Sequence, residues 1–132
     1  MQQQLSGVSI LLVEDNPEGR EVLETVLTLA GASVRTASNA EEALELLRGS
    51  VSAVIITDIK MPGHNGFWLL DQVRALPLPS AVPVIAYTGH VSRSDSQQLR
   101  AAGFDAHLAK PAELDEIEQM VLAFARWRPA RA

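Results

Sequence analysis

Five polar residues carry side chains suited to charge chemistry, and each one ends or follows an apolar stretch of β-strand length. Glu14 and Asp15 follow the first stretch, Asp58 follows another, and Thr88 and Lys110 stand at the ends of two more. Carboxylates crowded together repel one another strongly unless a cation joins them. An all-oxygen ligand set favours a hard divalent ion such as Mg²⁺. The sequence therefore predicts a magnesium site, with a hydroxyl and an ammonium group beside it, if these stretches meet in one sheet.

Other chemistries are excluded by what the chain lacks. It has no cysteine, which removes disulfides, thiolate metal sites and cysteine nucleophiles. His64, His90 and His107 lie on different segments without the i, i+4 spacing of a helical zinc motif, so packing or surface roles are the better interpretation. Phosphate-binding loop, dinucleotide-binding and nucleophile-elbow signatures are also missing. These observations argue against zinc, nucleotide-hydrolysis and serine-hydrolase chemistry.

The elements that must position these residues alternate between strand and helix. Apolar or alternating runs predict strands at 9–13, 33–36, 54–57, 84–88 and 106–108. Apolar residues at three- and four-residue spacing predict helices at 17–30, 40–49, 67–75, 92–102 and 114–124. This alternation is typical of a fold built from strand-helix-strand units.

Local signals predict how the helices begin and which faces they bury. Asn16 caps the first helix, and Ser38 with Glu41 has the spacing of a capping box for the second. The apolar stripe of the first helix is predicted to comprise Val22, Leu23, Val26, Leu27 and Ala30. That of the last helix is predicted to comprise Leu114, Ile117, Val121 and Phe124.

Strands that alternate with helices pair in parallel, because each right-handed crossover needs a helix to return the chain to the same end of the sheet. We therefore expect an α/β fold, a doubly wound five-stranded parallel sheet in a three-layer α/β/α sandwich. The first, third and fourth strands are almost wholly apolar and belong in the centre, so the flavodoxin-like order 2-1-3-4-5 fits. Ligands of such sheets bind outside the carboxyl ends of the strands, where the first and third strands meet.

Each candidate residue also has a plainer interpretation. Asp15 could start an acidic turn, Thr88 is a common strand residue, and Lys110 could be a solvated surface charge. Their joint placement at the strand ends favours a shared site. The chain has nine arginines but only two lysines, Lys60 and Lys110, and both fall beside this site. A compact ammonium can reach a phosphoryl oxygen without filling the pocket.

Length and composition fit one globular domain. The 132 residues are 47% hydrophobic and 20% charged, so we expect a single domain over 1–132, with a core at about 8–124 and a tail or linker at 128–132. The net charge of −5 argues against nucleic acid as a partner. No apolar run approaches a membrane span and no export signal precedes it, so we expect no membrane contact and a cytoplasmic location.

Four motifs together resemble the receiver domain of two-component response regulators. They are ILLVEDN at 10–16, TDIKMPG at 57–63 with Gly66, YTG at 87–89 and LAKP at 108–111. The similarity runs from about Val8 to Phe124. It implies a phosphorelay role in signal transduction, in which Asp58 accepts a phosphoryl group from a histidine kinase or a histidine phosphotransfer protein and an unidentified output protein reads the altered surface. The stretches 63–66, 88–89 and 106–110 look more like receivers attached to hybrid sensor kinases than like those fused to DNA-binding domains.

The resemblance also implies how Mg²⁺ is held and used. Asp58 is the nucleophile that becomes an acyl phosphate. Asp15 binds Mg²⁺ directly and Glu14 binds it through water. Asp58 itself and the backbone carbonyl of Lys60 are further ligands.

Three more positions take their roles from the resemblance. Lys110 pairs with one phosphoryl oxygen and the Thr88 hydroxyl with another. Thr88 and His107 are the switch positions that move after phosphorylation. His107 departs from the family pattern, since many receivers have tyrosine or phenylalanine there, which puts the usual inward swing of an aromatic ring in doubt.

Two other functions are weighed against this one. A Mg²⁺-dependent phosphohydrolase would share the aspartyl nucleophile but would need a further general acid and a substrate-covering cap, and the sequence suggests neither. A phosphorylation-independent interaction module is disfavoured by the intact set of Asp58, Thr88 and Lys110. We therefore expect a signalling switch and not an enzyme, which assists only its own aspartyl phosphorylation and dephosphorylation.

Overall fold

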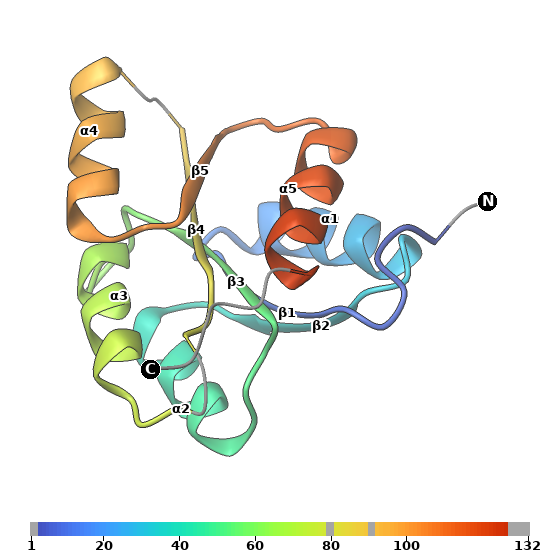
Figure 1. The fold of residues 1–132 in the computed structure, drawn as a ribbon, viewed down its shortest axis with the longest axis horizontal. Coiled ribbons are helices and arrows are strands. Elements are labelled where there is room, and N and C mark those ends of the chain that lie inside the picture. The colour runs from blue at the N-terminus through green and yellow to red at the C-terminus, as the bar shows by residue number, and fades with distance from the viewer. Residues whose placement is uncertain (1–2, 79–80, 90–91, 127–132) are drawn as a thin grey trace.

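The computed structural model describes residues 3–78, 81–89 and 92–126 (Figure 1). The strands are β1 (Ser9–Val13), β2 (Ser33–Ala37), β3 (Val54–Asp58), β4 (Val84–Thr88) and β5 (Ala106–Ala109). The helices are α1 (Pro17–Leu29), α2 (Ala40–Gly49), α3 (Gly66–Ala75), α4 (Arg93–Ala102) and α5 (Leu114–Arg126). Each element lies within a residue or two of its predicted position. The predicted tail at 128–132 and His90 lie outside the described residues.

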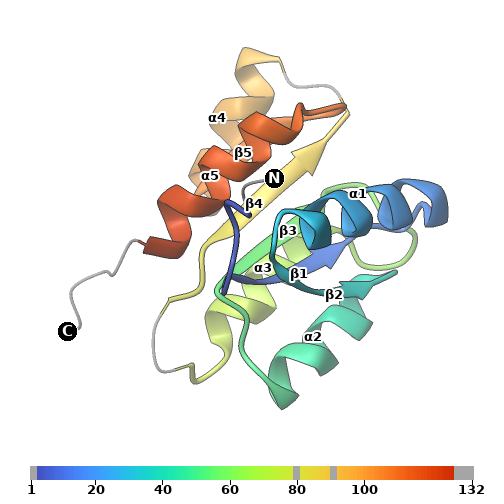
Figure 2. The ribbon, with the colours of Figure 1, turned by 90° about the vertical axis from the view of Figure 1, so that its right-hand side faces the viewer.

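The sheet has the predicted topology. All neighbouring strands pair in parallel in the order β2-β1-β3-β4-β5. Helices α1 and α5 cover one face, and α2, α3 and α4 lie on the other (Figures 1 and 2). The predicted three-layer, doubly wound α/β fold is therefore confirmed.

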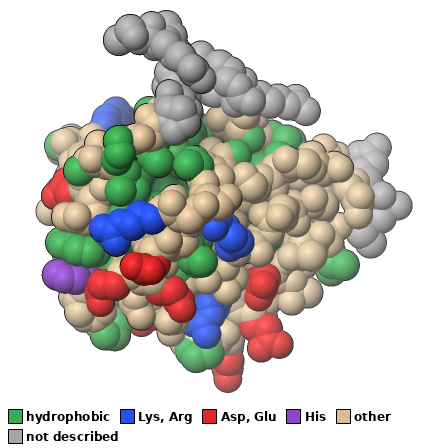
Figure 3. Space-filling view, turned by 90° about the horizontal axis from the view of Figure 1, so that it is seen from below, with side chains coloured by type: hydrophobic (Ala, Val, Ile, Leu, Met, Phe, Trp, Pro, Cys, Tyr) green, Lys and Arg blue, Asp and Glu red, His purple; other side chains and the backbone are tan. Residues whose placement is uncertain are grey.

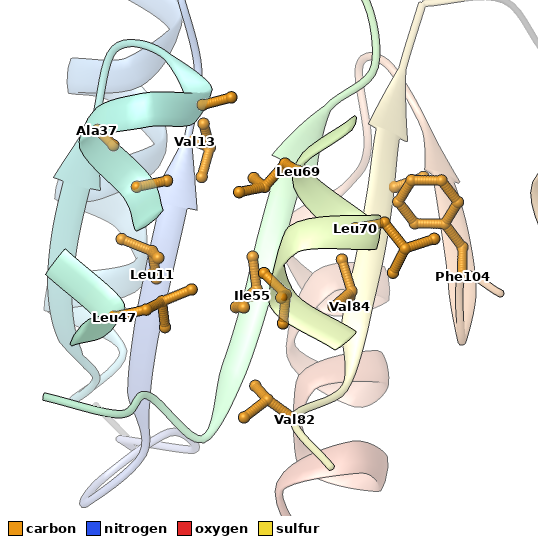
Figure 4. Packing of buried hydrophobic residues seen from close by; sticks show 14 of the residues in the cluster. Leu11, Val13, Ala37, Leu47, Ile55, Leu69, Leu70, Val82, Val84 and Phe104 are labelled. Atoms are coloured by element: carbon orange, nitrogen blue, oxygen red, sulfur yellow. The ribbon is translucent and has the colours of Figure 1, made fainter. Parts of the chain in front are cut away.

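Two apolar clusters fill the spaces between the layers. Alternation along a strand sends successive side chains to opposite faces, so Leu11 and Val13 pack beneath α2 and α3, whereas Ile10 and Leu12 pack beneath α1 and α5. Figure 4 shows the first cluster, in which Leu11, Ile55 and Val84 of the strands meet Leu47, Leu69 and Leu70 of α2 and α3. The central strands are buried on both faces, which is why they are almost wholly apolar.

Asparagine side chains cap the first three helices. Asn16, Asn39 and Asn65 accept hydrogen bonds at 2.8–2.9 Å from the backbone amides three residues onward. The predicted capping box of Ser38 and Glu41 is therefore wrong by one position. Asn39 is the cap, and the Glu42 carboxylate accepts a hydrogen bond from the Ser38 amide. The Asn39 amide oxygen lies where the first free helical N–H groups point, which the serine spacing alone did not reveal.

Two residues of the predicted apolar stripes are exposed. Val22 of α1 is 63% exposed and Leu114 at the start of α5 is 38% exposed. In contrast, Leu23, Leu27 and Val121 are buried as predicted. Helical spacing makes each stripe wider than the strip of sheet that it covers, so residues at its edge stay in solvent.

The surface mixes charges of both signs. On the face drawn in Figure 3, acidic side chains lie beside basic ones. An exposed pair of this kind is Arg48 and Glu45 on α2, 3.7 Å apart. Pairs of this type add little to stability, because water screens them.

Strand register brings distant segments together at one edge of the sheet. Val13 pairs with Thr57, and Asp58 pairs with Tyr87, so the residues after β1 lie beside the end of β3. The chain then turns back into α3 at Gly66. A Cβ atom at this position would lie 2.5 Å from the Asp58 carbonyl oxygen, so the close approach of α3 to the end of β3 requires glycine.

Candidate functional site

Three carboxylates meet at the carboxyl ends of β1 and β3. Glu14, Asp15 and Asp58 each offer an oxygen, and these oxygens lie within 4.8 Å of one another. Glu14 is 4% exposed and Asp58 is 2% exposed, while Asp15 is half-buried. The predicted meeting of these residues at one edge of the sheet is present in the structure.

Lys110 supplies a positive charge to this cluster. Its Nζ atom lies 2.5 Å from Asp58 Oδ1 and 3.0 Å from Glu14 Oε1. The Lys110 amide donates to the Thr88 carbonyl at 2.8 Å, which ties the end of β5 to the end of β4. The ammonium also stands 5.1 Å from the centre of the Tyr87 ring, within range of a cation–π contact. Lys110 therefore contacts residues at the carboxyl ends of three strands, β1, β3 and β4.

The crowding of charged groups shifts the pKa values of Asp58, Glu14 and Lys110. Burial and the neighbouring Glu14 carboxylate raise the pKa of Asp58 to about 8, although Lys110 opposes this shift. Burial also acts to raise the pKa of Glu14, but its contacts with Asp58, Lys110 and the Asn16 amide outweigh burial and lower it. Burial acts to lower the pKa of Lys110, but the two carboxylates outweigh burial and raise it. One ammonium therefore does not balance the negative charge of the cluster.

The donor set fits a hard divalent cation. Asp58 Oδ2 is buried, and no donor among residues 3–78, 81–89 and 92–126 forms a hydrogen bond to it. Such an atom is costly to bury unless a cation or hydrogen bond compensates it. With oxygens from Glu14 and Asp15 nearby, the site matches the ligand preference of Mg²⁺.

The first turn of α1 contributes contacts that the sequence reasoning missed. The Asn16 amide donates to Glu14 Oε2 at 3.2 Å, and Arg20 Nη1 donates to the Glu14 carbonyl at 2.9 Å. A helix that begins directly after an acidic pair was the available signal, because free N–H groups at a helix start attract carboxylates. The arginine contact had no signal in the spacing.

Thr88 follows Tyr87, which pairs with Asp58, and Lys60 lies two residues after Asp58. Together with residues of α3 and α4, they line a cavity of about 250 Å³, whose walls include Phe67 and Leu99. The Lys60 side chain is exposed. The role of the Thr88 hydroxyl as a partner of a phosphoryl oxygen stays a prediction. So does the role of the Lys60 backbone carbonyl as a ligand of Mg²⁺.

Two histidines make contacts away from the cluster. His107 Nε2 lies 3.3 Å from Ser96 Oγ of α4, so its ring links β5 to that helix. The His64 ring stacks on Trp68, with ring centres 3.8 Å apart. Both contacts fit the packing or surface roles expected for the histidines. The role of His107 as a switch residue stays a prediction.

The fold and the cluster define a class of protein, and comparison with known proteins gives the same class. The family model of the response regulator receiver domain matches residues 10–122. The chain therefore belongs to the receiver domain family of two-component signal transduction, a family of signalling switches that work with histidine kinases and output partners.

The chain spans different fractions of the lengths of its relatives. It is 37% identical over 126 residues to a 14.6 kDa protein in the sodA1 3′ region of Leptolyngbya boryana, covering 92% of this chain and 96% of that protein. It is 32% identical to sensor histidine kinase RcsC of Escherichia coli, covering 88% of this chain but 12% of the kinase. Its identity to response regulator Rre1 of Synechocystis is 36%, covering 86% of this chain and 50% of that protein.

Solved structures share the fold. The receiver domain of sensor histidine kinase PA1611 from Pseudomonas aeruginosa, which has a magnesium ion coordinated in its active site cleft, is 28% identical with a TM-score of 0.83, covering 91% of this chain and 98% of that one. The chemotaxis response regulator CheY4 of Vibrio cholerae is 27% identical with a TM-score of 0.81, covering 89% of this chain and 98% of that one.

Among the described residues, no helix has the length and apolar character that a membrane crossing needs.

Proposed function

We propose that Asp58 of this receiver domain accepts a phosphoryl group from a histidine kinase or a histidine phosphotransfer protein. The observation that carries the proposal is the buried Asp58 carboxylate, which lies 2.5 Å from the Lys110 ammonium and beside Glu14 and Asp15. In the transfer, an Asp58 oxygen attacks phosphorus, and the bond between phosphorus and the histidine nitrogen of the donor breaks. The product is an acyl phosphate on Asp58.

Mg²⁺ is the proposed cofactor, held by Glu14, Asp15, Asp58 and the backbone carbonyl of Lys60. When bound, it supplies positive charge that offsets the charge on the phosphoryl oxygens and favours ionised Asp58. A magnesium ion in the related PA1611 receiver supports this assignment.

Lys110 and Thr88 are proposed to bind the transferred group. The Lys110 ammonium already faces Asp58 Oδ1, so it can pair with a phosphoryl oxygen after transfer. Thr88, at the end of the neighbouring strand β4, would donate its hydroxyl to another oxygen. Movement of Thr88 would then pass to His107 and α4, and an output protein would read the changed surface.

The remaining parts of the proposal concern the context of the domain. We propose that residues 1–132 form one receiver domain with a core at about 8–124. Its activity would be limited to its own phosphorylation and dephosphorylation. A cytoplasmic location, with no nucleic acid or membrane as partner, completes the proposal.

The proposal is tested by incubating the chain with a small acyl-phosphate donor and Mg²⁺ and measuring its intact mass. We expect the gain of one phosphoryl group, which Asp58→Asn abolishes. Asp71→Asn is a matched control, because Asp71 is an exposed residue of α3, and this variant should be phosphorylated normally. Sustained turnover of phosphate esters would instead indicate a phosphohydrolase, and no phosphorylation would indicate an interaction module.

A further inference from the structure

The first turn of α1 holds Glu14 by both its side chain and its backbone. The Asn16 amide donates to Glu14 Oε2 at 3.2 Å, and Arg20 Nη1 donates to the Glu14 carbonyl at 2.9 Å. The Arg20 amide donates to the Asn16 carbonyl, also at 2.9 Å. Arg20 is thus joined through its side chain and its backbone to the short segment that carries the acidic pair.

The start of α1 lies close to the Glu14 carboxylate. A Cβ atom on Gly19 would lie 3.4 Å from Glu14 Oε1, at ordinary contact distance. In the described part of the chain, Arg20 forms no ion pair with a carboxylate, so its contact with Glu14 is made through the backbone carbonyl.

We infer that Arg20 is a positioning residue for the cation site. By fixing the carbonyl of Glu14, it fixes the peptide that joins Glu14 to Asp15, and with it the direction of both carboxylates toward Asp58. The inference rests on the proposed function, because it takes these carboxylates as ligands of Mg²⁺. Partners that orient a metal ligand affect affinity even though they do not touch the metal.

Charge alone leads to the opposite expectation. A guanidinium close to an acidic site repels Mg²⁺, so its removal should tighten cation binding. Loss of the hydrogen bond to Glu14 should weaken cation binding, because the acidic pair is no longer held in one orientation. The direction of the change in Mg²⁺ affinity therefore distinguishes positioning from simple charge.

The experiment measures the Kd for Mg²⁺ of the full chain by titration calorimetry. We expect Arg20→Met to bind Mg²⁺ about tenfold more weakly, and Arg20→Lys, which keeps a donor, to recover part of the loss. Arg48→Met is the matched control, because Arg48 is an exposed arginine of α2 paired with Glu45. It removes the same charge and should bind Mg²⁺ as tightly as wild type or slightly more tightly.

A second readout separates positioning from chemistry. At saturating Mg²⁺, Arg20→Met should be phosphorylated by the acyl-phosphate donor at the wild-type rate, because Arg20 touches neither Asp58 nor the transferred group. Equal or tighter Mg²⁺ binding by Arg20→Met overturns the inference, and so does a phosphorylation rate that stays low at saturating Mg²⁺. If Arg20→Met does not fold, Arg20→Ala, which also removes both the donor and the charge, decides, and wild-type affinity in it overturns the inference. Absence of Mg²⁺ binding by wild type overturns the proposed metal site itself.

Discussion

Lys110 Nζ lies 2.5 Å from Asp58 Oδ1 and also contacts Glu14, a residue 96 positions earlier in the chain. A single ammonium therefore faces two buried carboxylates, with Asp15 close by. The pKa of Asp58 rises to about 8 in this setting, first through burial and then through Glu14. The cluster is a place where an added divalent cation would relieve repulsion.

The pKa of Asp58 predicts how stability depends on pH in a chelator. The folded chain binds this proton more tightly than the unfolded chain, in which Asp58 has its ordinary pKa of 3.8. The stabilisation is thus fully present below about pH 4 and is lost as pH rises toward 8, with a slope of at most about 1.4 kcal/mol per pH unit. Denaturant unfolding of wild type and Asp58→Asn between pH 5 and 9 checks this. The stability of Asp58→Asn relative to wild type should grow with pH, and parallel curves would contradict the assignment.

Added Mg²⁺ should reduce the stability advantage of Asp58→Asn at alkaline pH. A ligand that binds only the folded state stabilises it by about 2.7 kcal/mol at a hundred times its Kd. Wild type should gain this stability, whereas Asp58→Asn, with one carboxylate fewer, should gain much less. Thermal unfolding at pH 8.5, in chelator and then in Mg²⁺, measures both. A mutant that melts below wild type in chelator would argue against a crowded acidic site.

Lys110→Met should separate cation binding from phosphoryl transfer. In this variant, Mg²⁺ no longer competes with the Lys110 ammonium for the oxygens of Asp58 and Glu14. We therefore expect the affinity of the chain for Mg²⁺ to rise about tenfold. The metal-free fold should lose about 1–3 kcal/mol, because two buried carboxylates lose their partner. Phosphorylation should nevertheless slow. Calorimetry and intact mass test the two effects, and weaker Mg²⁺ binding would refute the competition.

Gly66→Ala should destabilise the fold by about 1–3 kcal/mol. The added methyl group would lie 2.5 Å from the Asp58 carbonyl and 3.0 Å from the Ile59 Cα atom, so the backbone of the loop or of α3 must move. Gly49→Ala is the control, since a Cβ atom there meets nothing within 4 Å, and helix propensity makes this change neutral or stabilising. Equal denaturant midpoints for the two variants would show that the loop adapts freely.

Much of the fold could be predicted because its signals are local. Buried central strands require continuous apolar runs such as 54–57, and polar caps such as Asn16 mark helix starts. The cap Asn65 of α3 was not predicted. Exposed Val22 and the shift of the cap from Ser38 to Asn39 escaped prediction. Periodicity identifies an apolar face but does not show how much of it a neighbouring layer covers.

The sequence by itself determined the α/β class, the strand order and the candidate residues at the strand ends, because parallel pairing sends every carboxyl end to the same edge. Only the tertiary structure decided that Lys110 faces both Asp58 and Glu14, that Arg20 holds the Glu14 carbonyl and that His107 contacts Ser96. The direction of a long polar side chain depends on partners from other elements. Those partners are brought close only when the sheet and its helices are assembled.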